Sequence, residues 1–231
     1  MKVFGFPRHD PAPRLYRAVV VFLKWLVWLS RWRVRFVGLE HIPEHGPVVI
    51  VANHISYLDP ILIGLGVERR GRMVRYLAKR ELFDHWFTGP VMRGADQILV
   101  DRKGDAGAAL RHAEAAMAQG KLLVIFPQGT IRPTFDPSQG KTGAARLALA
   151  CGVPLVPAVA WGGQQIATKH QPRRSGWRTH HEVHFGPAIT AGPDDSAADL
   201  TLALMNAIGD LLRDAAAAHP RDLGPTFAEA S

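Results

Sequence analysis

The chain contains little of several residue types, and each scarcity narrows the class of protein that it can be. Cys151 is the single cysteine among 231 residues, which excludes an internal disulfide and agrees with a reducing compartment. Acidic residues are rare at the start, where Asp10 and Glu40 accompany eight Lys and Arg within the first forty residues. This segment therefore carries +6 of the formal net charge of +8. Such a basic excess indicates an anionic partner: nucleic acid, a membrane surface or a substrate.

Long uninterrupted apolar runs are also lacking. The most apolar stretch, from Tyr16 to Trp32, is interrupted by Lys24 and is shorter than the ~20 largely apolar residues that a spanning helix needs. Residues 1–14 do not have the pattern of a secretory signal, because the apolar run begins late, contains a charge and is followed by no small-residue cleavage site. We therefore expect the protein to stay on the cytoplasmic side of the cell membrane.

Residues 14–32 are instead typical of an amphipathic helix. Its cations recur at intervals of three or seven and form one basic stripe: Arg14, Arg17, Lys24 and Arg31. Apolar residues occupy a different face: Leu15, Val19, Phe22, Leu26 and Leu29. With three tryptophans, this pattern fits a helix in the lipid headgroup region better than one packed on the protein's own core, although both interpretations stay open. We expect a peripheral or monotopic protein on an anionic membrane surface, and no nucleic-acid partner.

The composition, with 47% hydrophobic residues, suits one globular domain. Apolar strands are expected at 33–37, 48–52, 97–100, 122–126, 153–160 and 182–185. Helices are expected at 60–65, 81–87, 106–118 and 196–217. This alternation predicts an α/β fold: a single domain with a mixed, largely parallel central sheet flanked by helices. The expected regions are the basic amphipathic interfacial helix at 1–32, the domain at 33–217 and a loose tail at 218–231.

The most informative segment is NHISYLDP, at residues 53–60. It places an imidazole, His54, and a carboxylate, Asp59, where an apolar strand ends and a helix begins, with Asp59 and Pro60 as the expected cap and first position. Such a pair can activate a hydroxyl: the imidazole takes the proton, while the carboxylate fixes its tautomer and stabilises the imidazolium. From this segment alone, a purely structural role is an equal alternative, because Asp before Pro is a good N-cap in its own right.

A second polar motif, FPQGTIR at 126–132, follows another expected strand. Because the carboxyl ends of parallel strands meet at one edge of a sheet, the two motifs are expected to share a cleft.

With both motifs in hand, the chain resembles the glycerophospholipid acyltransferases of the 1-acyl-sn-glycerol-3-phosphate acyltransferase type. Four blocks occur in that family's order: NHISYLD at 53–59, GADQILVDR at 94–102, FPQGTIR at 126–132 and VPLVPAV at 153–159. The resemblance covers roughly residues 33 to 190, and four ordered blocks are far more specific than any one of them.

The resemblance implies that His54 is the general base, that Asp59 orients it, and that the activated hydroxyl attacks the thioester of an acyl-CoA or acyl-carrier protein directly. No cofactor is implied beyond these donors. Arg102 and Arg132 would hold the phosphate of the lysophospholipid acceptor, for which a guanidinium offers a planar fork. The product would be phosphatidic acid.

Other residues of the motifs are candidates for the same binding site. Gly129 and Thr130 would let backbone amides approach the anion, and Lys141 is a further cation near an expected helix start. Each also has a structural explanation, as a turn or as a solvated side chain. Two departures from the family pattern stand out: Gln128 replaces a glutamate, and Ile131 displaces Arg132 by one position. Glutamine keeps the shape and hydrogen-bonding capacity while losing the charge, so we expect activity with a shifted acceptor preference.

Rival interpretations are weaker. Gly140-Lys141-Thr142 would need a glycine at position 135 to form a phosphate-binding loop, and Phe135 stands there. His180, His181 and His184 lack a matching set of carboxylates or thiols, so no metal is expected. Two alternatives stay open: an acyltransferase for another lysolipid or a glycolipid acceptor, and a catalytically degenerate lipid-binding homologue.

Overall fold

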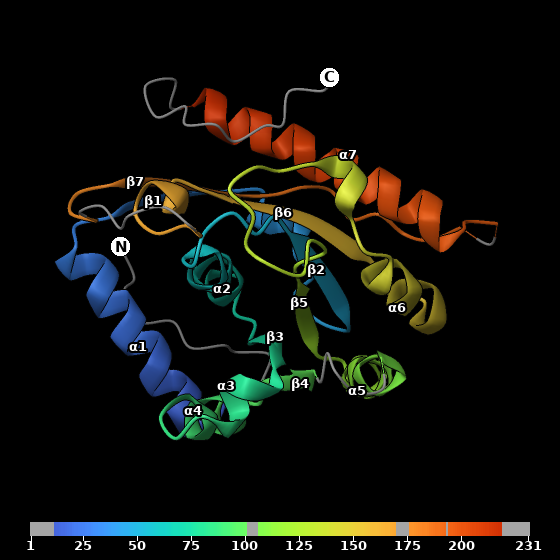
Figure 1. Ribbon diagram of the computed structural model, residues 1–231, viewed down its shortest axis with the longest axis horizontal. Helices are drawn as coiled ribbons and strands as arrows, with labels where there is room; N and C mark the ends of the chain where they lie inside the picture. The colour runs from blue at the N-terminus through green and yellow to red at the C-terminus, as the bar shows by residue number, and fades with distance from the viewer. Residues whose placement is uncertain (1–11, 101–105, 170–175, 193, 219–231) are drawn as a thin grey trace.

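The computed structural model describes residues 12–100, 106–169, 176–192 and 194–218. In this part of the chain seven strands form one sheet in the order β1-β7-β6-β2-β5-β3-β4 (Figure 1). The strands are β1 (Arg33–Val37), β2 (Val48–Ala52), β3 (Val74–Lys79), β4 (Ile98–Val100), β5 (Leu122–Ile125), β6 (Leu155–Trp161) and β7 (His180–Phe185). All neighbouring strands are parallel except β6 and β7, so the predicted mixed, largely parallel sheet is confirmed.

Helices cover both faces of this sheet. They are α1 (Arg14–Leu29), α2 (Asp59–Arg69), α3 (Arg80–Asp84), α4 (Thr88–Gly94), α5 (Ala106–Ala118), α6 (Gly143–Cys151) and α7 (Ala197–Ala217). Short 3-10 turns lie at η1 (Leu39–His41), η2 (Pro137–Gln139) and η3 (Gly163–Gln165). One apolar core joins the sheet to α5, α6 and α7, and a second joins the opposite face to α1 and α2.

The central strand β2 shows why the sequence folds in this way. All five of its residues are apolar and buried, as expected for a parallel strand covered on both faces. Because successive side chains point to opposite faces, Val49 and Val51 enter the core beneath α7, while Val48, Ile50 and Ala52 enter the core beneath α2. A run without polar alternation therefore occupies the middle of the sheet.

Two elements were not predicted, β3 and α4, whereas α6 begins close to the helix start expected near Lys141. The strand β3 was missed because its sequence, VRYLAK, contains an arginine and a lysine. Arg75 is nevertheless buried, with its Nε 2.7 Å from Asp96 Oδ2, and this ion pair joins residues far apart in sequence. The helix expected at 81–87 ends at Asp84, and α4 follows after a short corner.

The N-terminal helix α1 is joined to the rest of the fold on one side. Tyr16 and Val20 are buried, the Tyr16 hydroxyl accepts a hydrogen bond from the Val74 amide at 3.1 Å, and Lys24 pairs with Glu68 of α2 at 2.7 Å. Lys24 therefore does not share a solvent-facing stripe with Arg14 and Arg17, because a nearly buried carboxylate holds it. Of the helices in the described residues, none is long and apolar enough to cross a bilayer.

Candidate active site

His54 and Asp59 meet in the turn between β2 and α2. The His54 Nδ1 lies 3.3 Å from Asp59 Oδ2, and the same oxygen accepts hydrogen bonds from the amides of Ile55 and Ser56, each at 2.7 Å. Asp59 is therefore not the cap of α2: Leu58 precedes the helix, and the carboxylate turns back onto the turn before it. The imidazole is the partner of that carboxylate, as the sequence pattern predicts.

Burial separates the two members of the pair. Asp59 is fully buried, whereas the His54 side chain keeps 17% of its surface exposed. Burial raises the pKa of the Asp59 carboxyl, while bonds from His54 and from the two backbone amides oppose that rise. With Nδ1 directed at the carboxylate, Nε2 is the ring nitrogen that can take a proton from a hydroxyl in front of the site.

The turn that carries the pair is bonded to the segment after β6. The Asn53 side chain exchanges two hydrogen bonds with the backbone of Ala160, at 3.0 and 2.9 Å. The Ser56 hydroxyl donates to the carbonyl of Ala167 at 2.8 Å, and Thr168 donates to Ile55 at 2.5 Å. Because β6 neighbours β2, these bonds hold His54 at the carboxyl edge of the sheet.

The second motif lies against His54, as predicted from the shared edge of the sheet. The Gln128 Oε1 accepts the His54 amide at 2.8 Å, and the Arg132 amide donates to the His54 carbonyl at 2.9 Å. Gln128 is 3% exposed, and in this structure its side-chain oxygen contacts the backbone of His54. A binding role for Gln128 toward the acceptor stays a prediction.

Lys141 also joins this group. Its amide donates to Pro127 at 3.1 Å, and a Cβ added at Gly129 would lie 3.1 Å from the Lys141 ammonium. Gly129 has a φ of +69°, a conformation that favours glycine, so the turn and the lysine can come into direct contact. A cation therefore lies over the glycine turn that follows Pro127 and Gln128.

The other predicted binding residues differ in how well they are placed. Thr130 is partly exposed and Arg132 is exposed. Hydrogen bonds from Ser138 hold the pKa of Asp136 below its usual range, and the charge of Arg132 adds to this effect, so Arg132 has a carboxylate nearby. Arg102 lies outside the described residues.

An aromatic stack beside His54 was not predicted from the sequence. The Phe126 ring lies 4.3 Å from the His54 ring, centroid to centroid, with an interplanar angle of 22°, and Tyr76 of β3 continues the stack 6.1 Å further on. The Tyr76 hydroxyl donates to the carbonyl of Pro60, and burial raises its pKa well above the usual value. The phenylalanine at the start of FPQGTIR was the available signal, but its partner Tyr76 lies on the strand that was missed.

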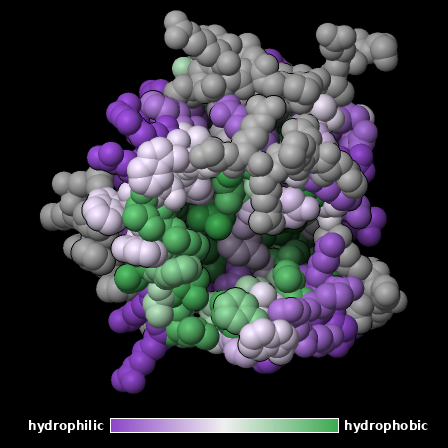
Figure 2. All heavy atoms as spheres, turned by 60° about the vertical axis from the view of Figure 1, so that its left-hand side comes forward, coloured by the Kyte–Doolittle hydropathy of each residue, from purple (hydrophilic) through white to green (hydrophobic). Residues whose placement is uncertain are grey.

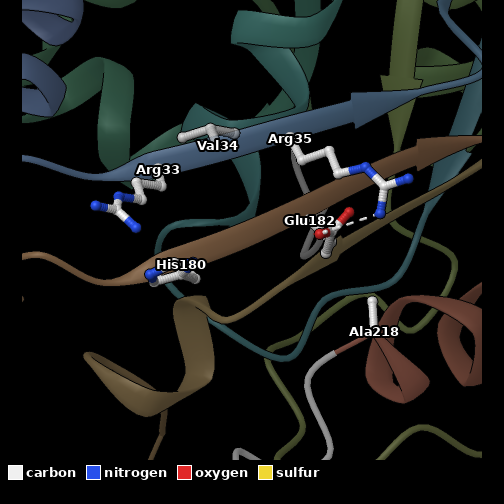
Figure 3. Close-up of a pocket in the computed structure, with 6 residues that line it drawn as sticks. All are labelled: Arg33, Val34, Arg35, His180, Glu182 and Ala218. Atoms are coloured by element: carbon white, nitrogen blue, oxygen red, sulfur yellow. Dashed lines mark ion pairs between the residues drawn. The ribbon is translucent and has the colours of Figure 1, made fainter.

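A separate cavity of about 350 Å³ lies where β1 and β7 pass the end of α7 (Figure 3). It is lined by Arg33, Val34, Arg35, His180, Glu182 and Ala218. Arg35 points toward Glu182, at 3.8 Å. The cavity contains none of the predicted site residues. Among the described residues, no group of His, Cys, Asp and Glu side chains is placed to hold a metal ion.

Fold and site together define an α/β protein with a histidine–aspartate pair, suited to activating a hydroxyl, at the carboxyl edge of a largely parallel sheet. A family model described as Acyltransferase matches residues 33–161, which contain both motifs. The chain belongs to this acyltransferase family.

Individual relatives carry more specific names. The chain is 33% identical over 187 residues to the human 1-acyl-sn-glycerol-3-phosphate acyltransferase alpha, covering 79% of this chain and 64% of the relative. It is 31% identical over 157 residues to a probable 1-acyl-sn-glycerol-3-phosphate acyltransferase of Mycoplasma pneumoniae, covering 66% and 57%. The chain thus spans about three fifths of the length of these relatives. With the Bacillus subtilis 1-acyl-sn-glycerol-3-phosphate acyltransferase it shares 28% identity over 174 residues, covering 74% and 85%.

The fold also resembles a solved structure. The crystal structure of the 1-acyl-sn-glycerophosphate acyltransferase PlsC from Thermotoga maritima matches with a TM-score of 0.68 at 21% identity, covering 86% of this chain and 79% of that one. At this identity the likeness establishes the fold alone.

Proposed function

We propose that the protein is a 1-acylglycerol-3-phosphate O-acyltransferase. It moves a fatty acyl group from acyl-CoA or acyl-carrier protein to the free hydroxyl of 1-acyl-glycerol-3-phosphate and gives phosphatidic acid. The observation that carries the proposal is the His54–Asp59 pair, in which the partly exposed imidazole lies against the FPQGTIR segment. The names of the relatives support the choice of acceptor.

The reaction needs no covalent intermediate on the protein. His54 Nε2 takes the proton of the acceptor hydroxyl as its oxygen attacks the thioester carbonyl, and Asp59 stabilises the imidazolium that forms. When the carbon–sulfur bond breaks, the imidazolium returns the proton to the leaving thiolate. The transfer therefore releases free CoA or carrier-protein thiol, with the histidine unchanged.

The cations near the base would bind the acceptor phosphate. Lys141 over the Gly129 turn is the best-placed cation among the described residues, and Arg132 is attached by its backbone to His54. Arg102 is proposed for the same role from the family pattern. Because phosphate carries its charge on several oxygens, the lysine ammonium and the arginine guanidinium groups can bind different oxygens of the same phosphate.

Two alternatives depend on named features. The neutral Gln128, at a position where the family pattern has glutamate, favours a different lysolipid or a glycolipid acceptor as the second candidate. A degenerate lipid-binding homologue would keep the fold without turnover. The basic and tryptophan-rich helix α1 supports a proposed location: a peripheral or monotopic protein on the cytoplasmic face of the cell membrane.

The first experiment measures thiol release by the purified chain from acyl-CoA, and from acyl-carrier protein, with lysophosphatidic acid or a phosphate-free monoacyl acceptor. His54→Ala should reduce turnover by about 10²–10⁴-fold, the range for loss of a general base. His112→Ala, an exposed histidine on α5, is the matched control and should behave like the parent chain. Equal rates for His54→Ala and the parent would remove His54 as the base, and transfer to the phosphate-free acceptor alone would favour the second candidate.

A further inference from the structure

The cavity of about 350 Å³ beside β1 and β7 is lined mainly by charged side chains. Arg33 and Arg35 belong to β1, His180 and Glu182 belong to β7, and the two strands pair with Arg33 opposite His180. Figure 3 shows Arg33 and His180 at the start of the two strands and the Arg35 guanidinium directed at Glu182. Both strands therefore contribute polar groups to one hollow.

The charge of this cavity is predominantly positive. The Arg35 side chain keeps 67% of its surface exposed, and its guanidinium lies 3.8 Å from Glu182 Oε1, beyond hydrogen-bond distance. The other carboxylate oxygen of Glu182 pairs with His184 Nε2 at 3.0 Å. Arg33 is exposed and forms no ion pair with another described residue. Two arginine forks whose charge is only partly compensated suit a ligand that carries phosphate groups.

The cavity lies at the same edge of the sheet as His54. The strand β7 runs antiparallel to β6, so it starts where β6 and β2 end. A Cβ added at Gly162 would lie 2.4 Å from the His180 carbonyl oxygen, and one added at Gly163 would lie 2.9 Å from the Ser56 hydroxyl oxygen. The two glycines after β6 thus join the start of β7 to the turn that carries His54.

The cations proposed for the acceptor lie on the other side of His54. Arg132 and Lys141 follow β5, which neighbours β2 on one side, whereas β6, β7 and β1 follow in order on the other side. Strands lie about 4.8 Å apart, which places β7 and β1 roughly 10 to 15 Å from β2. A second substrate bound over β7 and β1 would therefore meet the acceptor at His54 without competing for its cations.

The chemistry of an acyl-CoA donor fits this interval. In acyl-CoA a pantetheine arm joins the thioester to a pyrophosphate and a phosphorylated ribose. The arm has about the backbone length of four amino-acid residues, so it spans at most ~15 Å. With the thioester at His54, the phosphates of the nucleotide can therefore reach the cavity.

The lining and size of the cavity separate this ligand from other occupants. Its apolar lining consists of Val34 and Ala218 alone, whereas hydrophobic side chains gather around a hollow on the face that Figure 2 turns forward. A phosphate group thus suits the cavity better than an acyl chain does. Its volume is in the range of small-molecule pockets, so the nucleotide of a coenzyme fits it better than the convex surface of a carrier protein.

We propose that the cavity between β1, β7 and the end of α7 binds the nucleotide phosphates of acyl-CoA. Arg33 and Arg35 bind phosphate oxygens, and the buried Glu182 orients Arg35 from beneath. The choice of acyl-CoA as the ligand rests on the proposed function. Binding of the nucleotide part by itself needs no turnover and can be measured separately.

Calorimetric titration with adenosine 3′,5′-bisphosphate tests the cavity directly. Arg33→Gln should weaken binding about fivefold, and Arg33→Glu on the order of tenfold or more, because a carboxylate repels phosphate. Arg111→Gln, an exposed arginine on α5 beside β4 and β5, is the charge-matched control and should bind like the parent. Arg35→Gln uncovers Glu182, so thermal unfolding accompanies it and the Arg33 variants decide the outcome. No binding by the parent, or parent-like binding by Arg33→Glu, would overturn the site.

Thiol release supplies the second measurement. With acyl-CoA as the donor, Arg33→Gln should raise the donor KM about fivefold and leave kcat and the acceptor KM unchanged. With acyl-pantetheine, which lacks the phosphates, the difference in donor KM between the parent and Arg33→Gln should disappear. Bisphosphate binding that depends on Arg33, without any transfer by the parent, would defeat the proposed function and leave the site standing. Transfer from acyl-CoA with a parent-like donor KM in Arg33→Glu, or a raised KM for acyl-carrier protein alone, would overturn the site and leave the proposed function intact.

Discussion

His54 is held on several sides by contacts of different kinds. Asp59 faces Nδ1, Gln128 accepts the amide, Arg132 donates to the carbonyl, and Phe126 lies against the ring. Two of these four residues act on the backbone and two on the imidazole. If His54 is the base, as proposed, a side chain held in this way loses little freedom when the hydroxyl arrives, which favours the near-attack geometry that transfer requires.

Two variants of Gln128 separate the effect of its hydrogen bond on turnover from the effect of charge at this position. Gln128→Glu keeps an oxygen in place for the His54 amide and should retain most of the turnover, since the family pattern carries glutamate there. Gln128→Ala leaves the partly buried His54 amide without its partner, at a cost of about 1–3 kcal/mol, and should lower turnover about tenfold or more. Steady-state kinetics of the two variants, with thermal unfolding as the control, distinguishes them. Parent-like kinetics in Gln128→Ala would show that this bond does not position the base.

Phe126 is expected to act as a positioning residue through its ring. Phe126→Leu removes the stack against His54, and because a misplacement of about 1 Å can cost up to 10²-fold, kcat should fall about tenfold while KM changes little. Phe126→Tyr keeps the ring and should restore the rate. If both variants lose the same fraction of kcat, or if KM rises instead, the ring serves packing or acceptor binding and not the base.

Ion pairs determine how the irregular elements attach to the sheet. Asp96, after α4, pairs with Arg75 of β3 at 2.7 Å and with Lys121 at 2.9 Å. Partial burial opposes the charge of Asp96, but the bonds from Arg75 and Lys121 outweigh it and hold the pKa of this carboxyl below its ordinary value. The three residues connect β3, the strand that carries Tyr76, with the segment after α4 and the turn before β5.

The lowered pKa predicts how the stability depends on pH. A carboxylate of this kind stabilises the fold above its ordinary pKa of about 3.8 and stops doing so as the pH falls through the lower folded-state value. Asp96→Asn should therefore destabilise the protein at pH 7 by on the order of 1 kcal/mol, since exposure and solvent screening keep the effect small. Asparagine also tolerates the φ of 53°. Unfolding curves of the two proteins should converge below about pH 3.8, and Asp210→Asn on α7 serves as the control. A difference that persists unchanged at low pH would contradict this account.

Across the molecule as a whole, polarity is distributed unevenly. The face covered by α7 is closed by a continuous apolar core, whereas the face covered by α1 ends in exposed aromatic and aliphatic side chains. The same helix supplies buried residues to the second core. One element therefore serves both the stability of the fold and the proposed contact with lipid.

Removing residues 1–32 should consequently do more than abolish vesicle binding. The deletion exposes the surface that Tyr16 and Val20 cover, at about 1.5–3 kcal/mol for each buried side chain, and leaves Glu68 without Lys24. The melting temperature should fall and binding of a hydrophobic dye should rise. An unchanged melting temperature would show that α1 is an independent appendage.

Much of the fold was predictable because β2, β5 and β6 are apolar throughout and the glycines and prolines around them mark the turns. The strand β3 escaped prediction because the partner that makes a buried arginine possible, Asp96, lies far away in sequence. The exposure of Trp86 and Phe87 could not be predicted from the sequence either, because an apolar pair in a short helical segment is typical of a core.

The residue types and their order predicted the candidate site and the family: an imidazole and a carboxylate across a strand-to-helix turn, and a glycine turn with cations. These features are local: the two-residue period of strands and the restricted φ of proline allow strands and turns to be predicted from short segments of sequence. Tertiary packing alone placed Gln128 against the backbone of His54, Phe126 against its ring and Lys24 against Glu68. Those contacts depend on strand order and helix packing, which bring together residues that no short-range pattern relates.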